Sequence, residues 1–101
     1  MEAIGLLVRL EARAGKEADV EEFLRSAQPL ALDEKGTLKW YALKLGPRTF
    51  GIFDTFANEA GRNDHLTGEI AKKLTARASE LFAAPPQVDK VEVLVNTPLK
   101  G

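Results

Sequence analysis

Residues 40–56 read WYALKLGPRTFGIFDTF. Two apolar runs flank the compact connector Gly46-Pro47-Arg48, a pattern typical of an antiparallel hairpin with strands over 38–45 and 49–56. The stretch contains five of the seven aromatic residues of the chain, including its only Trp and its only Tyr. If the chain has a pocket, we expect the hairpin and the start of the next helix to build it.

The segments on either side of the hairpin predict the rest of the fold. Residues 4–11 alternate as in a strand, and apolar residues over 18–31 recur at helical spacing. After the hairpin, Asn58 is a good helix N-cap, a helical pattern runs to about Leu81, and Val88–Val95 reads as a last strand. The order predicts an α+β, ferredoxin-like βαββαβ fold, with a four-stranded antiparallel sheet that carries both helices on one face.

Two sites should interrupt the helices. Pro29 lies late in the first helix and should kink or end it, because proline lacks the backbone N–H and clashes with the preceding turn. Gly61 and Thr67-Gly68 weaken the second helical region, which would then form two segments joined by a bend.

Length and composition exclude several classes of protein. The 101 residues suffice for one domain, residues 1–101, and 45% hydrophobic content is too high for a disordered chain. The net charge of −1 and the lack of a Lys/Arg cluster argue against a nucleic-acid partner and against an electrostatically bound membrane partner. The chain has no long apolar run and no signal-peptide layout, so we expect a cytoplasmic protein.

The residue inventory also limits the chemistry. The chain has no Cys and a single His, so it offers few of the side chains that usually coordinate a transition metal. It also lacks a Gly-rich phosphate loop. We therefore predict no metal and no cofactor.

The sheet face without helices is expected to be partly apolar. Two helices can cover one face only, yet the other face would carry side chains from the second and last strands: Tyr41, Leu43, Leu45, Val91, Val93 and Val95. A second copy of the chain is the simplest cover, which predicts a homodimer packed through the sheet face. The alternative is a monomer with a partly apolar open face.

His65 is the first candidate catalytic residue, since its ordinary pKa of about 6.5 suits acid or base work near neutral pH. In one unbroken helix its side chain would lie opposite the apolar stripe and be solvated. A bend near Thr67-Gly68 would instead turn it toward the sheet.

Asp54 is the second candidate catalytic residue. By alternation it shares a strand face with Phe50, Ile52 and Phe56, and an unpaired carboxyl group in such surroundings has a raised pKa that suits acid–base chemistry. The alternatives are an ion pair with Arg9 or with a Lys of a neighbouring strand, or exposure at the strand end.

Trp40, Tyr41 and Arg62 are the candidate substrate-binding residues. Trp40 and Tyr41 are adjacent in a strand and so point to opposite faces, where either ring would line a pocket for a flat aromatic molecule or serve only as core or interface. Arg62, like Arg48, could pair with an anionic substrate, although single surface arginines are common.

A resemblance supports this interpretation. It rests on Ala14-Gly15-Lys16-Glu17 before an acidic helix, Gly36-Thr37-Leu38 at the start of the aromatic strand, Phe53-Asp54-Thr55-Phe56, and Gly61-Arg62-Asn63-Asp64-His65-Leu66. In these segments, over nearly its whole length, the chain resembles the small dimeric α+β-barrel proteins of the antibiotic biosynthesis monooxygenase type.

The resemblance implies a ferredoxin-like homodimer, the dimeric α/β barrel, with a pocket in each subunit between helices and sheet. Members include cofactor-independent oxygenases, in which the substrate supplies electrons as its own carbanion, with His65 or Asp54 as base and Trp40 or Tyr41 as pocket wall. Haem-degrading members use an Asn on the first strand and a His late in the second helix. This chain has neither, which argues against haem degradation.

We therefore predict a cofactor-independent oxygenase that acts on a small aromatic or quinone-like molecule. The alternative is a small-molecule-binding or stress-response dimer of the same fold without turnover.

Overall fold

The chain folds into a four-stranded sheet with helices on one side. The computed structural model describes residues 2–100, and these form four strands and three helices. The elements are β1 (Ile4–Glu11), α1 (Glu17–Asp33), β2 (Thr37–Lys44), β3 (Thr49–Phe56), α2 (Glu59–Leu66), α3 (Glu69–Leu81) and β4 (Gln87–Glu92). The predicted α+β, ferredoxin-like βαββαβ order is confirmed, with its second helix divided in two.

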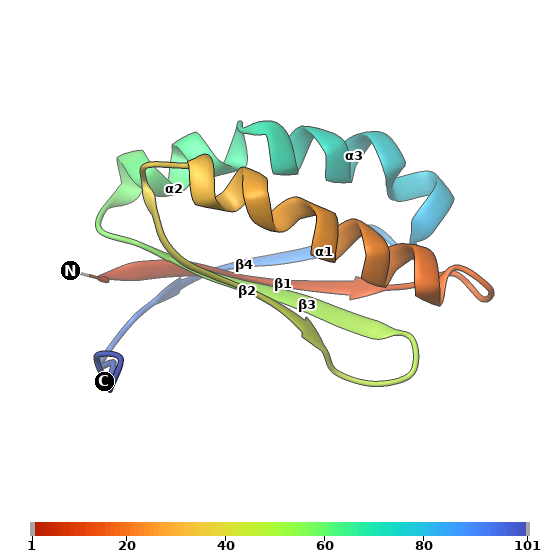
Figure 1. The fold of residues 1–101 in the computed structure, drawn as a ribbon, viewed down its shortest axis with the longest axis horizontal. Helices are drawn as coiled ribbons and strands as arrows, with labels where there is room; N and C mark the ends of the chain where they lie inside the picture. Colours follow the sequence, from red (N-terminus) through yellow and green to blue (C-terminus); the bar gives the residue numbers. More distant parts are fainter. Residues whose placement is uncertain (1, 101) are drawn as a thin grey trace.

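The sheet has the order β2-β3-β1-β4, and every neighbouring pair is antiparallel. All three helices lie over the same face of this sheet (Figure 1). Leu6 pairs with Asp54, and Asp54 pairs with Trp40 on the other side. Residues directly opposite one another in an antiparallel ladder share a face. These three side chains therefore form one row on the helix side.

The core lies between the sheet and the helices, because alternate residues of β1 and β3 point toward α1 and α3. At one end, buried residues from both strands and both helices form a large cluster: Val8, Leu10, Ala12, Val20, Phe23, Leu24, Phe50, Ile52, Leu81 and Phe82. A smaller cluster at the other end contains Ala27, Ala31 and Ile70, with Leu30 and Trp40 packed against it. The second cluster borders the region where α2 meets α3.

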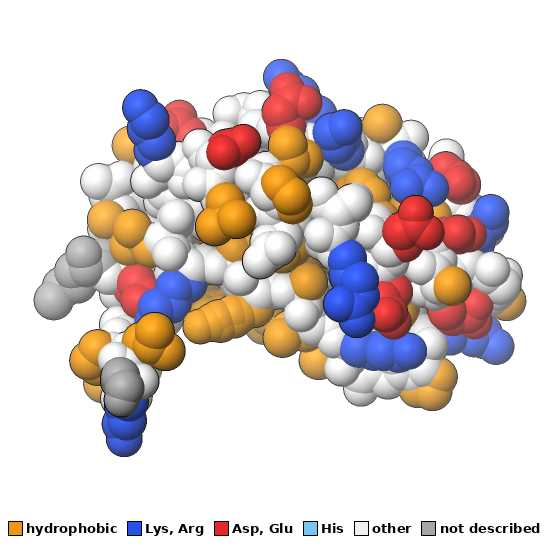
Figure 2. Space-filling view, viewed as in Figure 1, with side chains coloured by type: hydrophobic (Ala, Val, Ile, Leu, Met, Phe, Trp, Pro, Cys, Tyr) orange, Lys and Arg blue, Asp and Glu red, His pale blue; other side chains and the backbone are white. Residues whose placement is uncertain are grey.

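Within residues 2–100, no helix covers the other face of the sheet (Figure 1). Tyr41, Leu43 and Leu45 are exposed there, and Phe53 is half-buried. Figure 2 looks along the edge of the sheet and shows hydrophobic side chains at its lower border and on the C-terminal segment, with charged side chains around the helices.

Two details differ from the sequence-based expectation. Pro29 does not end α1, which continues to Asp33. Ala27 and Ala31 on either side of it are buried, so packing holds the helix together across the missing hydrogen bond. The last strand ends at Glu92 rather than Val95, because Glu92 already pairs with Ile4, the first residue of β1.

Candidate functional site

A break between α2 and α3 orients His65. The side chain of Asn58 accepts a hydrogen bond from the backbone N–H of Gly61 and caps α2, which ends at Leu66 before Thr67 and Gly68. The predicted bend is therefore present at Thr67-Gly68. It turns the side chain of His65 inward, where it is buried beside the ring of Phe56.

His65 lies between two carboxylates that come from different elements. Its Nδ1 is 2.5 Å from Oε1 of Glu34, the residue after α1, and its Nε2 is 2.9 Å from Oδ2 of Asp54 on β3. Asp54 is completely buried, and its Oδ1 has no hydrogen-bond partner among the described residues. We call Glu34, His65 and Asp54 the carboxylate–histidine cluster.

The two carboxylates keep His65 protonated. Burial by itself would lower the pKa of the imidazole, but hydrogen bonding and charge interaction with Asp54, then with Glu34, outweigh it and raise the pKa to about 8. At neutral pH the cluster therefore contains a cation between two carboxylate groups.

The loop after α1 brings Glu34 to this position. Thr37 donates a hydrogen bond of 2.7 Å to Glu34 Oε1. The backbones of Gly36 and Gly61 touch, since a Cβ placed on Gly36 would lie 2.8 Å from the Cα of Gly61. Side chains at these two positions would separate the loop from α2, and Glu34 would then lose contact with His65.

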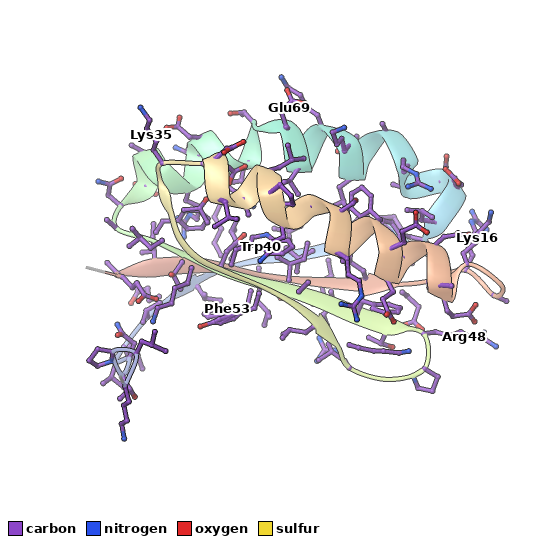
Figure 3. The ribbon with its side chains drawn as sticks, viewed as in Figure 1. Lys16, Lys35, Trp40, Arg48, Phe53 and Glu69 are labelled. Carbon is purple, nitrogen blue, oxygen red and sulfur yellow. The ribbon has the colours of Figure 1, made fainter. Side chains whose placement is uncertain are left out.

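A cleft of about 330 Å³ opens beside the cluster, between this loop and the junction of α2 and α3. Glu34 and His65 line it, and Asp54 does not. Among the described residues, the charged side chains of the wall are mostly acidic: Asp33, Glu34, Asp64 and Glu69, together with Lys35. Lys35 and Glu69 lie on the helix side of the molecule (Figure 3).

The two aromatic candidates lie on opposite faces of the sheet, as predicted. Trp40 is half-buried against the smaller core cluster on the helix side, and its indole Nε1 is buried without a hydrogen-bond partner among residues 2–100. Tyr41 is exposed on the open face, where its ring meets Phe53 edge-on at 6.4 Å. Figure 3 shows Trp40 and Phe53 on either side of the strands. The sheet therefore separates Tyr41 from His65.

Arg62 is buried and contacts groups of its own chain. Its guanidinium donates to the carbonyl oxygen of Gly5 at 3.4 Å and lies 3.5 Å from a carboxylate oxygen of Glu59. It does not line the cleft beside His65. Arg48 pairs with Glu17 at 3.4 Å.

The partner of Asp54 differs from those that the sequence suggested. Arg9 lies on the open face, opposite Gly51, and no lysine is paired with Asp54 in the described structure. The ion pair of Asp54 is with His65 instead.

Glu34 is the member of the cluster that sequence reasoning missed. It lies in what looked like a simple exit turn, 31 residues before its partner. The one available signal was Gly36, which marks a place where another backbone approaches closely.

Two negative findings apply to residues 2–100. Within this range, no group of three or more His, Asp or Glu side chains is arranged to hold a metal ion. None of the helices in the same range is long and apolar enough to cross a membrane.

Comparison with known proteins gives a family and a fold. No protein-family model matches the chain, and no curated protein matches it. Among solved structures, NE2512 from Nitrosomonas europaea, a protein of unknown function, shares 52% identity with a TM-score of 0.96, over 100% of this chain and 98% of that one.

More distant structures share the fold alone. A candidate antibiotic biosynthesis monooxygenase from Nitrosomonas europaea has a TM-score of 0.83 at 14% identity, over 95% of this chain and 94% of that one. Another from Caulobacter crescentus has a TM-score of 0.79 at 16% identity, over 93% and 92%. The chain therefore belongs to the same family as NE2512, and its fold is that of the antibiotic biosynthesis monooxygenase-like proteins.

Proposed function

We propose that this protein is a cofactor-independent oxygenase that acts on a small, uncharged aromatic or quinone-like molecule. The observation that carries the proposal is the carboxylate–histidine cluster beside a cleft. A buried, charged triad costs desolvation energy, and perturbed ionisable groups of this kind gather at functional sites. The shared fold of candidate monooxygenases supports the reaction class.

The reaction needs acid–base chemistry and dioxygen. For a substrate with an acidic CH₂ group, removal of one proton leaves the C–H electron pair on the substrate as an enolate. The enolate gives electrons to dioxygen, a C–O bond forms, and the peroxide takes up a proton. Loss of water then breaks the O–O bond and the remaining C–H bond, so that CH₂ and O₂ become C=O and H₂O. The protein supplies the proton transfers, which contribute roughly 10²- to 10⁴-fold to a rate.

The charge of the cleft limits the class of substrate that it can bind. Four carboxylates and one lysine line it, together with His65. An anionic substrate would meet net negative charge at close range, where the repulsion is only partly screened. An uncharged ring, such as a hydroquinone or an anthrone, avoids this cost.

We further propose that the protein is a homodimer through its open sheet face. Leu43 and Tyr41 are exposed on that face. The C-terminal segment projects on the same side of the sheet (Figure 1), and Leu94 and Leu99 in it are 91% and 94% exposed. A second copy of the chain would cover both surfaces. In sedimentation velocity, Leu43→Lys should yield monomers, whereas Leu32→Lys on α1, also at an exposed leucine, should remain dimeric. Dissociation in both variants or in neither would contradict this interface.

The second candidate function is a small-molecule-binding dimer without turnover. It is favoured by one observation, namely that both ring nitrogens of His65 are engaged by carboxylates. In this case the cluster would serve only to join α1, α2 and β3.

Oxygen uptake distinguishes the two functions. The wild-type protein is supplied with a panel of hydroquinones and anthrones, alongside His65→Gln and the control Glu80→Gln, which removes a carboxylate at the far end of α3. The oxygenase proposal expects uptake by the wild type and the control, with at least a tenfold loss in His65→Gln. Binding of panel compounds to the wild type without uptake would favour the second candidate.

A further inference from the structure

His65 has no free nitrogen with which to accept a proton from a bound molecule. Its Nδ1 contacts Glu34 and its Nε2 contacts Asp54, and an imidazole has only these two nitrogens. At neutral pH both carry protons. For His65 to act as the base, it would first have to lose a proton and one of the two carboxylate contacts.

The three members of the cluster differ in their access to the cleft. The side chains of Glu34, His65 and Asp54 are 18%, 9% and 0% exposed, in that order. Glu34 therefore forms the open end of the cluster, and Asp54 on β3 forms its closed end.

The two carboxylate oxygens of Glu34 differ in their hydrogen bonding. Its Oε1 accepts from Thr37 and contacts His65, which fixes the orientation of the carboxylate. Its Oε2 is buried with no hydrogen-bond partner among residues 2–100. It lies beside Gly68, where a Cβ would come within 3.0 Å of it. A buried carboxylate oxygen without a donor is costly, and such groups call for a functional or structural explanation.

We propose that Glu34 is the catalytic residue that takes the proton from the bound molecule, an inference that rests on the oxygenase function proposed above. From the cleft inward, the groups lie in the order substrate, Glu34, His65 and Asp54. The substrate C–H bond breaks, an O–H bond forms on Glu34, and the electron pair stays on the substrate as the enolate. Glu34 later returns the proton to the peroxide.

His65 and Asp54 are positioning residues in this scheme. The imidazolium holds Glu34 in place and balances part of the negative charge that the enolate adds to the site. Asp54 in turn holds the imidazole from the buried side. The arrangement places a carboxylate, rather than a histidine, toward the substrate.

The test separates proton removal from the oxygen step. In anaerobic D₂O, exchange of the CH₂ protons of the anthrones in the panel reports abstraction alone, and oxygen uptake with the same anthrones reports the whole reaction. The proteins are the wild type, Glu34→Gln, Glu34→Asp and His65→Gln, with Glu80→Gln as control. Circular dichroism and melting temperature establish that each variant is folded.

We expect Glu34→Gln to lose about 100-fold or more in both exchange and kcat, because the amide cannot accept the proton. His65→Gln should keep more activity than Glu34→Gln, since the carboxylate remains. If Glu34→Gln fails to fold, Glu34→Asp serves instead. It retains the carboxylate but shortens its reach by one methylene, so kcat should fall by at least tenfold.

The possible failures are distinguishable. Exchange by Glu34→Gln at the wild-type rate, or a larger loss in His65→Gln than in Glu34→Gln, would overturn the role of Glu34 and leave the oxygenase function standing. If the folded Glu34→Asp variant has wild-type kcat, the role of Glu34 is likewise wrong. A wild-type protein that neither exchanges protons nor consumes oxygen with any compound would overturn both proposals.

Discussion

The stability of the protein should fall as pH rises from 6 to 9, because the fold raises the pKa of His65 to about 8. In the unfolded chain the pKa of histidine is about 6.5. Below pH 6.5 both states are protonated and the stabilising contribution is present in full. It is lost as pH rises through 8, where the folded protein releases its proton. The difference of about 1.5 between the two pKa values corresponds to about 2 kcal/mol in the free energy of unfolding.

Urea unfolding at one-unit pH intervals, at fixed protein concentration, measures this loss. His65 is the only histidine in the chain, so few other groups titrate in the same range. His65→Gln is the matched variant, because it keeps a polar side chain but cannot titrate. Subtracting its pH dependence removes the contribution of the chain's α-amino group. A direct check is the NMR titration of the imidazole, whose midpoint should lie near 8.

Two results would refute the reasoning. One is a parallel decline of stability in the wild type and in His65→Gln, which would assign the pH dependence to other groups. The other is an imidazole midpoint near 6.5, which would mean that the two carboxylates do not outweigh burial in solution.

Three further predictions concern single substitutions. Gly36→Ala should lower the free energy of unfolding by about 1–3 kcal/mol in urea titrations, because its Cβ would meet the backbone of α2 at 2.8 Å. Gly46 has open space around it, so Gly46→Ala should change the free energy of unfolding little. Equal losses in the two variants would contradict the close contact. Pro29→Ala should raise the melting temperature and the free energy of unfolding, the latter by about 1–2 kcal/mol, because it restores a helical hydrogen bond at an exposed position. An unchanged or lower melting temperature would show that the proline does not destabilise α1. Asp54→Asn should shift the NMR midpoint of His65 from about 8 toward 6.5, and a midpoint that stays at 8 would show that Asp54 does not stabilise the imidazolium.

Most of the fold could be predicted from local signals. The alternation over residues 4–11 and the hairpin about Gly46 fixed three of the strands to within one residue of their observed ends. The prediction that Pro29 could end the first helix was wrong, since α1 continues to Asp33. Propensity describes an isolated helix, whereas burial of Ala27 and Ala31 decides the outcome in the folded chain.

The candidate site could be predicted only in part. The position of His65 depended on a bend that Thr67-Gly68 signalled, and alternation placed Asp54 on the correct face. Glu34 could not be predicted, because its contact with His65 arises where two segments distant in sequence meet. No periodic pattern records such a contact.

The backbone contact between Gly36 and Gly61 implies a signature by which related chains can be sorted. A chain of this fold that has a larger residue at either glycine has to hold its loop farther from α2, and a glutamate at position 34 would then fall short of the histidine. The four residues Glu34, Gly36, Gly61 and His65 should therefore be gained and lost together among homologues. Chains that keep all four would be the ones to screen first for shared substrates.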